Sequence, residues 1–468
     1  MKFNHSMNMD NLNTFVGENS LLDFLNPKKT ITPLVELPSK LNRFKKENGV
    51  RIFIKLMSHT TLFNVKHVTV YSMLENFKKK GSGIVESSSG NTAFTLSILA
   101  KYFGYEKTKF FFSHRVPIDK LNLIKLVANE IEIIKEPLCP DKNDPNSSIN
   151  KAKKLSKESD YDNLDQYSNP SNPKGHYEIT GKQIVEQLKH LNLNIDYLFA
   201  AVGTTGTIVG SSLKIKEHFP KLKTVGVASA DDMTRLGARS KNSLEEIYFD
   251  WRSYVDDLIE VNVECAFLHS IKLIKHGLLV GPSTGHIFAG LLKYIEDNNL
   301  KNVNLVFVSC DTFLPYVNEY IKYLSNKHLA DVVNEDLALS YANIQSRIRG
   351  RKYDQFKILP EVFVEKYKNL DKTSICLDVR KDSEYDSFRL KNTVKINLHD
   401  LEHDILGFVE NLGNYHNVYI LDCGMSDAAK LACLILRDQK INAYWIEGGI
   451  DYISKKWSNL ILRSGSPI

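Results

Sequence analysis

Short apolar runs alternate with segments of helical spacing between residues 31 and 325. The apolar runs predict strands at 51–56, 109–113, 131–135, 197–201, 224–228, 278–280 and 304–308. Buried strands separated by helices are typical of a mostly parallel, doubly wound sheet. Ligands of such sheets bind in the loops beyond the carboxyl ends of the strands. The pattern therefore predicts an α/β fold and points to those loops as the place of a functional site.

The first informative loop is the turn Glu-Ser-Ser-Ser-Gly-Asn-Thr at residues 86–92. The apolar pair Ile84-Val85 precedes it, and a run of helical spacing over 93–103 follows it. Hydroxyls and backbone N–H groups at a helix N-terminus can converge on one anionic group. We interpret the turn as a carboxylate-binding site. An ordinary helix capped by Ser or Asn is the alternative.

A lysine lies in the first turn of another predicted helix, which opens in the segment 58–68 and runs to about residue 80. This lysine, Lys66, lies between Val65 and Val68. Burial and the positive end of the helix dipole both disfavour its ammonium form, so we expect a lowered pKa. A neutral lysine can form a Schiff base. A lysine whose stem lies along the surface is the alternative.

Three further loops carry polar or phosphate-binding patterns. Residues 165–173 form a rigid polar segment with two Asn-Pro steps. Gly-Thr-Thr-Gly-Thr at 203–207 follows a strand and opens a helix, which is typical of a phosphate cradle. It lacks the Gly-Lys-Ser/Thr ending and the dinucleotide spacing, which favours a small phosphorylated ligand over ATP or NAD. Gly-Pro-Ser-Thr-Gly at 281–285 adds a hydroxyl. Together these groups describe a pyridoxal phosphate site for an amino acid.

Over roughly residues 30–325 the order of these segments resembles the fold-type II pyridoxal phosphate family of cysteine synthases and cystathionine β-synthases. The resemblance implies two doubly wound α/β subdomains, with Lys66 as the Schiff-base lysine and general base. It implies that the cofactor is bound by Lys66, Asn91, Gly203, Thr204, Thr205, Gly206, Thr207 and Ser283. It implies that the substrate carboxylate is bound by Ser88, Ser89, Thr92 and Gln166.

Two departures from the family pattern are visible. His67-Val68 replaces the usual Asp-Arg after the lysine, and Thr205 replaces the middle glycine of the phosphate loop, which adds a donor. Ser283 matches the family serine on the pyridine nitrogen, and a serine there favours β-elimination and β-replacement. The first departure, together with the altered loop over 58–65, puts the identity of the substrate in doubt but removes no cofactor contact.

The last third of the chain predicts a separate α/β domain over 358–462, joined by a polar, basic linker over 326–357. Leu-Asp-Val-Arg at 377–380 and Gly-Gly-Ile at 448–450 resemble a rhodanese domain. Cys423 falls where that family carries its persulfide, at a strand end before a helix. Ser426 and Ala428 stand where the family has Gly and Arg, and Asp427 would raise the thiol pKa. An inert core cysteine is the alternative.

The resemblance implies β-replacement on a β-substituted L-serine, of the O-acetylserine or O-phosphoserine type, with sulfide. The product would be L-cysteine, formed through an aminoacrylate. Within the same family, a 2,3-diaminopropionate synthase and a cysteine desulfhydrase are alternatives. A non-catalytic, pyridoxal phosphate-binding regulatory protein is an alternative of another class. The resemblance also implies a homodimer.

Composition restricts the partners, metal sites and location that we expect for the protein. The chain has 468 residues, of which 43% are apolar and 25% charged, as in soluble globular proteins. Its net charge of +6 is spread among interleaved charges, which argues against a nucleic-acid partner. No apolar run is long enough to span a membrane, and the polar arm over 1–30 shows no secretion signal. The six cysteines form no Cys-x-x-Cys pair, so we expect no metal site and a reducing cytoplasm.

Overall fold

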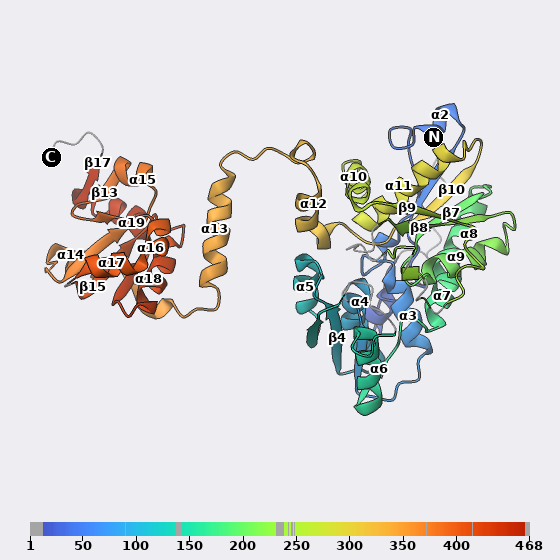
Figure 1. Ribbon diagram of the computed structural model, residues 1–468, viewed down its shortest axis with the longest axis horizontal. Coiled ribbons are helices and arrows are strands. Elements are labelled where there is room, and N and C mark those ends of the chain that lie inside the picture. Colours follow the sequence, from blue (N-terminus) through green and yellow to red (C-terminus); the bar gives the residue numbers. More distant parts are fainter. Residues whose placement is uncertain are drawn as a thin grey trace. The chain divides into compact units, whose positions relative to one another are not determined.

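Two sets of strands follow one another along the chain. The computed structural model describes residues 13–463 except 89, 137–142, 231–237, 242, 245, 246, 248, 371 and 414. The chain folds into two compact units, one up to Ala330 and one from Asp331 (Figure 1). Ser89 of the predicted carboxylate turn lies outside the described residues.

A six-stranded sheet forms the larger layer of the first unit. Its strand order is β1-β2-β10-β7-β8-β9, and only β1 runs antiparallel to its neighbour. The strands are β1 (Leu34–Glu36), β2 (Arg51–Lys55), β10 (Asn304–Val308), β7 (Tyr197–Ala201), β8 (Lys223–Ser229) and β9 (Asp257–Val261).

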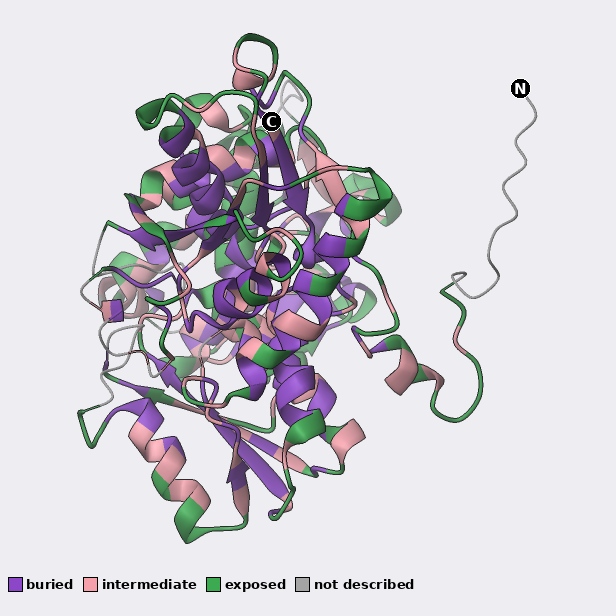
Figure 2. Ribbon diagram, turned by 90° about the vertical axis from the view of Figure 1, so that its right-hand side faces the viewer, coloured by how far each residue is buried: buried purple, intermediate pink, exposed green. Residues whose placement is uncertain are grey.

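Helices cover both faces of this sheet because its strands are apolar on both sides. In β10, Leu305 and Phe307 pack in one core with α10 (Val263–Ile274) and α11 (Pro282–Asp297). Val306 and Val308 pack in a second core with α8 (Lys182–His190) and α9 (Gly206–Lys216). Figure 2 shows buried residues along these central strands and on the helices that cover them.

A parallel four-stranded sheet in the order β5-β4-β3-β6 completes the first unit. The strands are β5 (Glu130–Ile134), β4 (Lys107–Ser113), β3 (Gly83–Ser87) and β6 (Tyr161–Asn163). One face packs against α3 (Lys66–Asn76), α4 (Asn91–Leu99) and α5 (Ile118–Lys125), and the other against α6 (Ser148–Glu158). The remaining helices are α1 (Ser20–Phe24), α2 (Phe44–Glu47), α7 (Ser171–Gly175), a π-helix (His176–Gly181) and α12 (Val317–Tyr323).

Most predicted strands are confirmed, but the one at 278–280 is wrong. Leu278–Val280 joins α10 to α11 and pairs with no strand of the described chain. Val280 belongs to the core of α10 and α11 and Leu278 packs against that core, whereas Leu279 is exposed. The helix predicted to reach about residue 80 ends at Asn76, before a run of lysines.

The second unit is built on a parallel sheet in the order β11-β16-β15-β12-β14. Its strands are β11 (Lys357–Ile358), β16 (Ala443–Ile446), β15 (Asn417–Leu421), β12 (Ser374–Asp378) and β14 (Val394–Lys395), with a separate antiparallel pair of β13 (Phe388–Leu390) and β17 (Ile461–Arg463). Its helices are α13 (Glu335–Ile348), α14 (Pro360–Lys368), α15 (Asp382–Ser387), α16 (Leu398–His403), α17 (Ile405–Leu412), α18 (Ala428–Asp438) and α19 (Gly449–Lys456).

The segment 326–357, predicted as a linker, contributes structure to the second unit. It carries α13, and Ile344 and Ile348 of this helix pack in the same core as α18. Two of the basic residues of this segment, Arg347 and Arg351, form ion pairs with Glu402 and Asp438 of the same unit. Across the described residues of the chain, no helix has the length and apolar content that a membrane crossing needs.

Candidate active site

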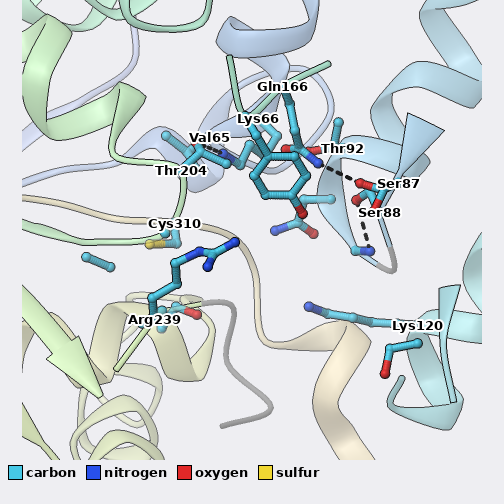
Figure 3. Close-up of a pocket in the computed structure, with 18 of the residues that line it drawn as sticks. Val65, Lys66, Ser87, Ser88, Thr92, Lys120, Gln166, Thr204, Arg239 and Cys310 are labelled. Atoms are coloured by element: carbon cyan, nitrogen blue, oxygen red, sulfur yellow. Dashed lines mark hydrogen bonds between the residues drawn. The ribbon is translucent and has the colours of Figure 1, made fainter. Parts of the chain in front are cut away.

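Loops from both sheets of the first unit meet at one pocket, at the carboxyl ends of the strands (Figure 3). The residues predicted from the sequence that line it are Lys66, Ser88, Asn91, Thr92, Gln166, Gly203, Thr204, Thr205, Thr207 and Ser283. Gly206 lies one residue behind the lining, at the start of α9. Residues far apart in the sequence are therefore brought together as the parallel sheets require.

Lys66 is the first residue of α3, and its side chain points into the pocket. Its Nζ donates a hydrogen bond to Thr204 Oγ1 at 3.1 Å. Burial lowers the pKa of Lys66 from 10.5 to about 8, and the nearby Cys310 thiol acts weakly in the opposite direction. The backbone N–H of Val65 donates to the carbonyl of Cys310, which ties the lysine loop to the end of β10. With this pKa about a tenth of the lysine is neutral at pH 7 and about half at pH 8.

The turn after β3 is not an ordinary capped helix. The N-cap residue of α4 is Gly90, which offers no side chain to cap the first turn. Thr92 Oγ1 donates to Gln166 Oε1 at 2.7 Å, and Gln166 Nε2 donates to the carbonyl of Ser87 at 3.0 Å. These bonds hold Thr92 and Gln166 side by side at the positive end of a helix, where an anion would be stabilised.

The phosphate loop is supported from behind by the Asn-Pro segment. A Cβ at Gly206 would overlap the amide of Asn172, so only glycine fits. Asn172 Nδ2 donates to Thr204 Oγ1 at 3.0 Å. Thr205 has a φ of 65°, in the left-handed region of the backbone. Glycine adopts this conformation without strain, which explains why the family pattern has a glycine at this position. Its hydroxyl donates to the carbonyl of Thr204, so the extra donor expected from this substitution is directed to the backbone.

His176 extends this support. Its Nε2 lies 3.1 Å from Thr69 Oγ1 and 3.2 Å from Thr207 Oγ1, and its Nδ1 lies 2.9 Å from Thr180 Oγ1. Burial, with a smaller effect of the Lys66 charge, lowers the pKa of His176 to about 3. The imidazole is therefore neutral and serves to fix three threonines around the loop.

Several residues in the pocket or beside it were not predicted from the sequence. Asp311 accepts hydrogen bonds from Asn91 Nδ2 at 2.7 Å and from the Tyr316 hydroxyl at 2.6 Å, so it orients the predicted cofactor-binding amide. Lys120 and Arg239 line the same pocket. Asp311 lies just beyond β10, so its position after a buried strand was a usable signal. Arg239 follows no apolar run that would have marked it.

The residues present fit pyridoxal phosphate. A lysine with a lowered pKa lies within hydrogen-bond distance of the phosphate loop, as a cofactor with an aldehyde and a phosphate requires. Thr205 is the N-cap residue of α9, and its side chain accepts no hydrogen bond from the first turn of that helix. The backbone N–H groups of this turn are therefore available to bind a phosphate. In the described part of the chain no cluster of His, Cys, Asp and Glu could hold a metal ion.

Cys423 lies in the second unit, between β15 and α18, and is half-buried. The carboxylate of the preceding Asp422 accepts hydrogen bonds from the N–H groups of Gly424 at 2.7 Å and Ala429 at 3.1 Å. It also accepts from the Ser426 hydroxyl at 3.1 Å. Donors that could face an anion beside the thiol are therefore directed to a carboxylate of the chain itself.

Comparison with known proteins agrees with the geometry of the first unit. The model of the family described as "Pyridoxal-phosphate dependent enzyme" matches residues 25–311. A cystathionine beta-synthase of Saccharomyces cerevisiae is 30% identical over 331 residues, which cover 64% of this chain and 63% of that protein. A probable cysteine synthase of Bacillus subtilis is 28% identical over 54% of this chain and 83% of its own length.

A solved structure supports the same conclusion. The crystal structure of a hydrogen sulfide-producing enzyme, in complex with an α-aminoacrylate intermediate, superposes with a TM-score of 0.54 at 27% identity. The match covers 68% of this chain and 93% of that one, and it confirms the fold-type II architecture. This chain spans less than two thirds of the length of the yeast relative. The chain belongs to the family of pyridoxal-phosphate dependent enzymes, and its relatives are cysteine synthases and cystathionine β-synthases.

Proposed function

We propose that the first unit catalyses β-replacement on a β-substituted L-serine with sulfide, giving L-cysteine. One observation carries the proposal: Lys66 Nζ reaches Thr204 of the phosphate loop in the pocket that also holds Thr92 and Gln166. The same pocket therefore offers an amine, a phosphate site and a carboxylate site.

Pyridoxal phosphate, when bound, supplies an aldehyde for the amine and an electron sink for charge on the substrate α-carbon. Lys66 would hold it, and the loop 203–207, Asn91 and Ser283 would fix its orientation. Ser88, Thr92 and Gln166 would bind the substrate carboxylate. When it is not bonded to the cofactor, the neutral Lys66 amine would act as the general base. It would remove the proton from the α-carbon of the substrate and later return it. Ser89 remains part of the proposed carboxylate site, outside the described residues.

The yeast relative favours a second candidate, in which a larger thiol replaces sulfide and the product is cystathionine. The family resemblance also leaves 2,3-diaminopropionate synthesis and cysteine desulfuration as candidate reactions. A regulatory protein that binds the cofactor without turnover is the candidate outside catalysis. We further propose a homodimer, which sedimentation of the purified protein tests. The rhodanese-like assignment of the second unit and the cytoplasmic location stay predictions.

A substrate screen on the purified full chain tests the proposal. The protein, loaded with pyridoxal phosphate, is given each β-substituted L-serine with sulfide, with an amine, with a larger thiol or with no nucleophile, and the products are identified by mass spectrometry. Cysteine formed only with sulfide supports the proposal. Products formed with an amine alone or with a larger thiol alone would select 2,3-diaminopropionate or cystathionine synthesis, and the absence of any turnover would favour the regulatory protein.

A further inference from the structure

Asp311 is a buried acid beside the active-site pocket that takes no part in the mechanism above. It lies just beyond β10, and its exposed fraction is 1%. A buried carboxyl costs free energy unless its oxygens accept hydrogen bonds. The groups that contact this carboxyl therefore indicate its role.

The main chain around Asp311 is joined to the lysine loop and to the start of α11. Asn64, two residues before Lys66, forms an isolated antiparallel β-bridge with Asp311. The backbone N–H of Gly281 donates to the carbonyl of Asp311 at 2.8 Å, next to the helix that carries Ser283. A Cβ on Gly281 would lie 2.4 Å from Asp311 Oδ1, so glycine leaves the room that the carboxyl needs. The position of the carboxyl is therefore fixed by two elements that carry cofactor-binding residues.

The Asp311 carboxyl accepts two hydrogen bonds on a single oxygen. Asn91 Nδ2 donates to Oδ2 at 2.7 Å, and the Tyr316 hydroxyl donates to the same oxygen at 2.6 Å. Oδ1 is buried and has no hydrogen-bond partner within the described residues. Burial raises the pKa of Asp311, and Lys120 with the two donors acts in the opposite direction. Because both donors use Oδ2, only Oδ1 could carry a proton, and the bond from Asn91 would persist in either protonation state.

This bond determines which way the Asn91 amide faces. An asparagine amide has two N–H hydrogens on its nitrogen and two lone pairs on its oxygen. Asp311 accepts from Nδ2, and no described residue accepts the second N–H or donates to Asn91 Oδ1. If the amide exchanged the places of its nitrogen and oxygen, two acceptor oxygens would face each other. Asn91 therefore lines the pocket with its amide in one orientation and with one N–H unused.

We propose that Asp311 is a positioning residue, which holds the Asn91 amide so that its unused N–H donates to the ring oxygen of bound pyridoxal phosphate and keeps that oxygen ionised. The inference rests on the cofactor contact proposed for Asn91 and does not depend on the choice of substrate. A hydrogen bond donated to the charged form of a group favours that form. Without the acceptor at position 311, the amide is free to turn its own oxygen towards the ring oxygen, which favours the protonated, neutral form.

The ionisation of the ring oxygen can be measured without turnover. An ionised phenol absorbs at longer wavelength than a neutral one, so the two forms of the bound cofactor give separate bands. We expect the wild-type holoenzyme to show mainly the long-wavelength band. Asp311→Ala should lower the ratio of the long-wavelength to the short-wavelength band by about fivefold, as expected when one hydrogen bond of ordinary strength is lost.

Three further variants separate this role from a structural one. Asp311→Asn keeps an oxygen that can accept from Asn91 and should retain the wild-type band ratio. Gly281→Ala crowds Oδ1 while Asp311 is still present, and it should lower the ratio even if Asp311→Ala does not fold. Asp257→Ala is a matched control, because Asp257 accepts from the Tyr294 hydroxyl at 2.5 Å and neither residue lines the pocket. It should cost stability in thermal unfolding and leave the ratio unchanged.

Titration of the apoprotein with pyridoxal phosphate gives a second measure. Asp311→Ala should weaken cofactor binding by about fivefold, because the N–H of Asn91 is no longer aimed at the ring oxygen. Asn91→Ala should weaken it at least as much. In the double variant the two effects should not add, because Asp311 acts through Asn91.

Three results would overturn the inference. One is a band ratio that neither Asp311→Ala nor Gly281→Ala changes. Another is a pair of effects on cofactor affinity that add fully in the double variant. The third is an equal loss of the ratio in Asp311→Asn and Asp311→Ala, which would assign the effect to the charge of the carboxyl and not to the orientation of the amide. None of these measurements uses an amino acid substrate, so a failure to form cysteine would reject the proposed function alone.

Discussion

At position 66 an amine is held at the first turn of α3, 3.1 Å from the hydroxyl of Thr204. The sequence could predict this lysine because apolar neighbours and a helix start are local features. It could also predict Thr92 and Thr204 as site residues, because each lies in a loop beyond the carboxyl end of a strand. The two strands belong to different sheets, so the meeting of the two loops at one pocket is seen only in the structure. Lys120 and Arg239 could not be predicted, because their convergence depends on the packing of separate elements.

The pKa of Lys66 predicts how the apoprotein takes up its cofactor with pH. Only the neutral amine can attack an aldehyde, and burial brings the pKa from 10.5 to about 8. The rate of pyridoxal phosphate incorporation should therefore rise with pH and level off above about 8. Visible absorbance after mixing apoprotein and cofactor at a series of pH values measures it. A rate that keeps rising towards pH 10.5 would show an ordinary, exposed lysine.

At the scale of elements, helices and strands were predicted where an apolar run was long or had a clear period. The apolar run at 278–280 has only three residues, which is too short to tell a strand from a connection between two helices. In 326–357 a polar composition concealed α13, because among the described side chains of that helix only Ile344 and Ile348 pack in the core. A narrow apolar stripe is difficult to separate from a solvated segment without its packing partner.

The packing of α13 predicts how the second unit responds to substitution. Ile348 is 2% exposed, so Ile348→Ala should destabilise the unit by about 2–5 kcal/mol through lost burial and a cavity. Leu337→Ala on the same helix removes a side chain that is 55% exposed and should cost less than about 0.5 kcal/mol. Hydrogen exchange of the β12 and β15 amides in the full chain measures both. Equal protection of these amides in the two variants would show that α13 does not stabilise the second unit, as expected of a linker.

For the whole molecule, the two units differ in what their loops offer. In the first unit, loops at the strand ends direct an amine, hydroxyls and helix N-termini into one pocket. In the second unit, the loop at Cys423 directs its donors to Asp422. The sequence left open whether the two domains exchange sulfur, and the position of this carboxylate argues against a sulfur-carrying role for Cys423.

This difference makes a prediction about Cys423. Because a carboxylate takes the N–H groups that would stabilise an anion beside the thiol, the chain should not transfer sulfur from thiosulfate to cyanide. Cys423→Ser should form cysteine from free sulfide at the wild-type rate. Mass spectrometry of the intact chain after treatment with thiosulfate tests the same point. A persulfide on Cys423, or a slower Cys423→Ser enzyme, would show that the second unit carries sulfur.

The central claim is that one amine holds the cofactor covalently. Three lysines of the first unit, Lys55, Lys66 and Lys120, have pKa values lowered by burial, so all three are candidates on chemical grounds. Only Lys66 donates to the phosphate loop in the described structure. Borohydride reduction of the protein loaded with pyridoxal phosphate, followed by peptide mass spectrometry, fixes the modified residue. The account predicts a pyridoxyl group on Lys66, and a group on Lys55, on Lys120 or on no lysine would contradict it.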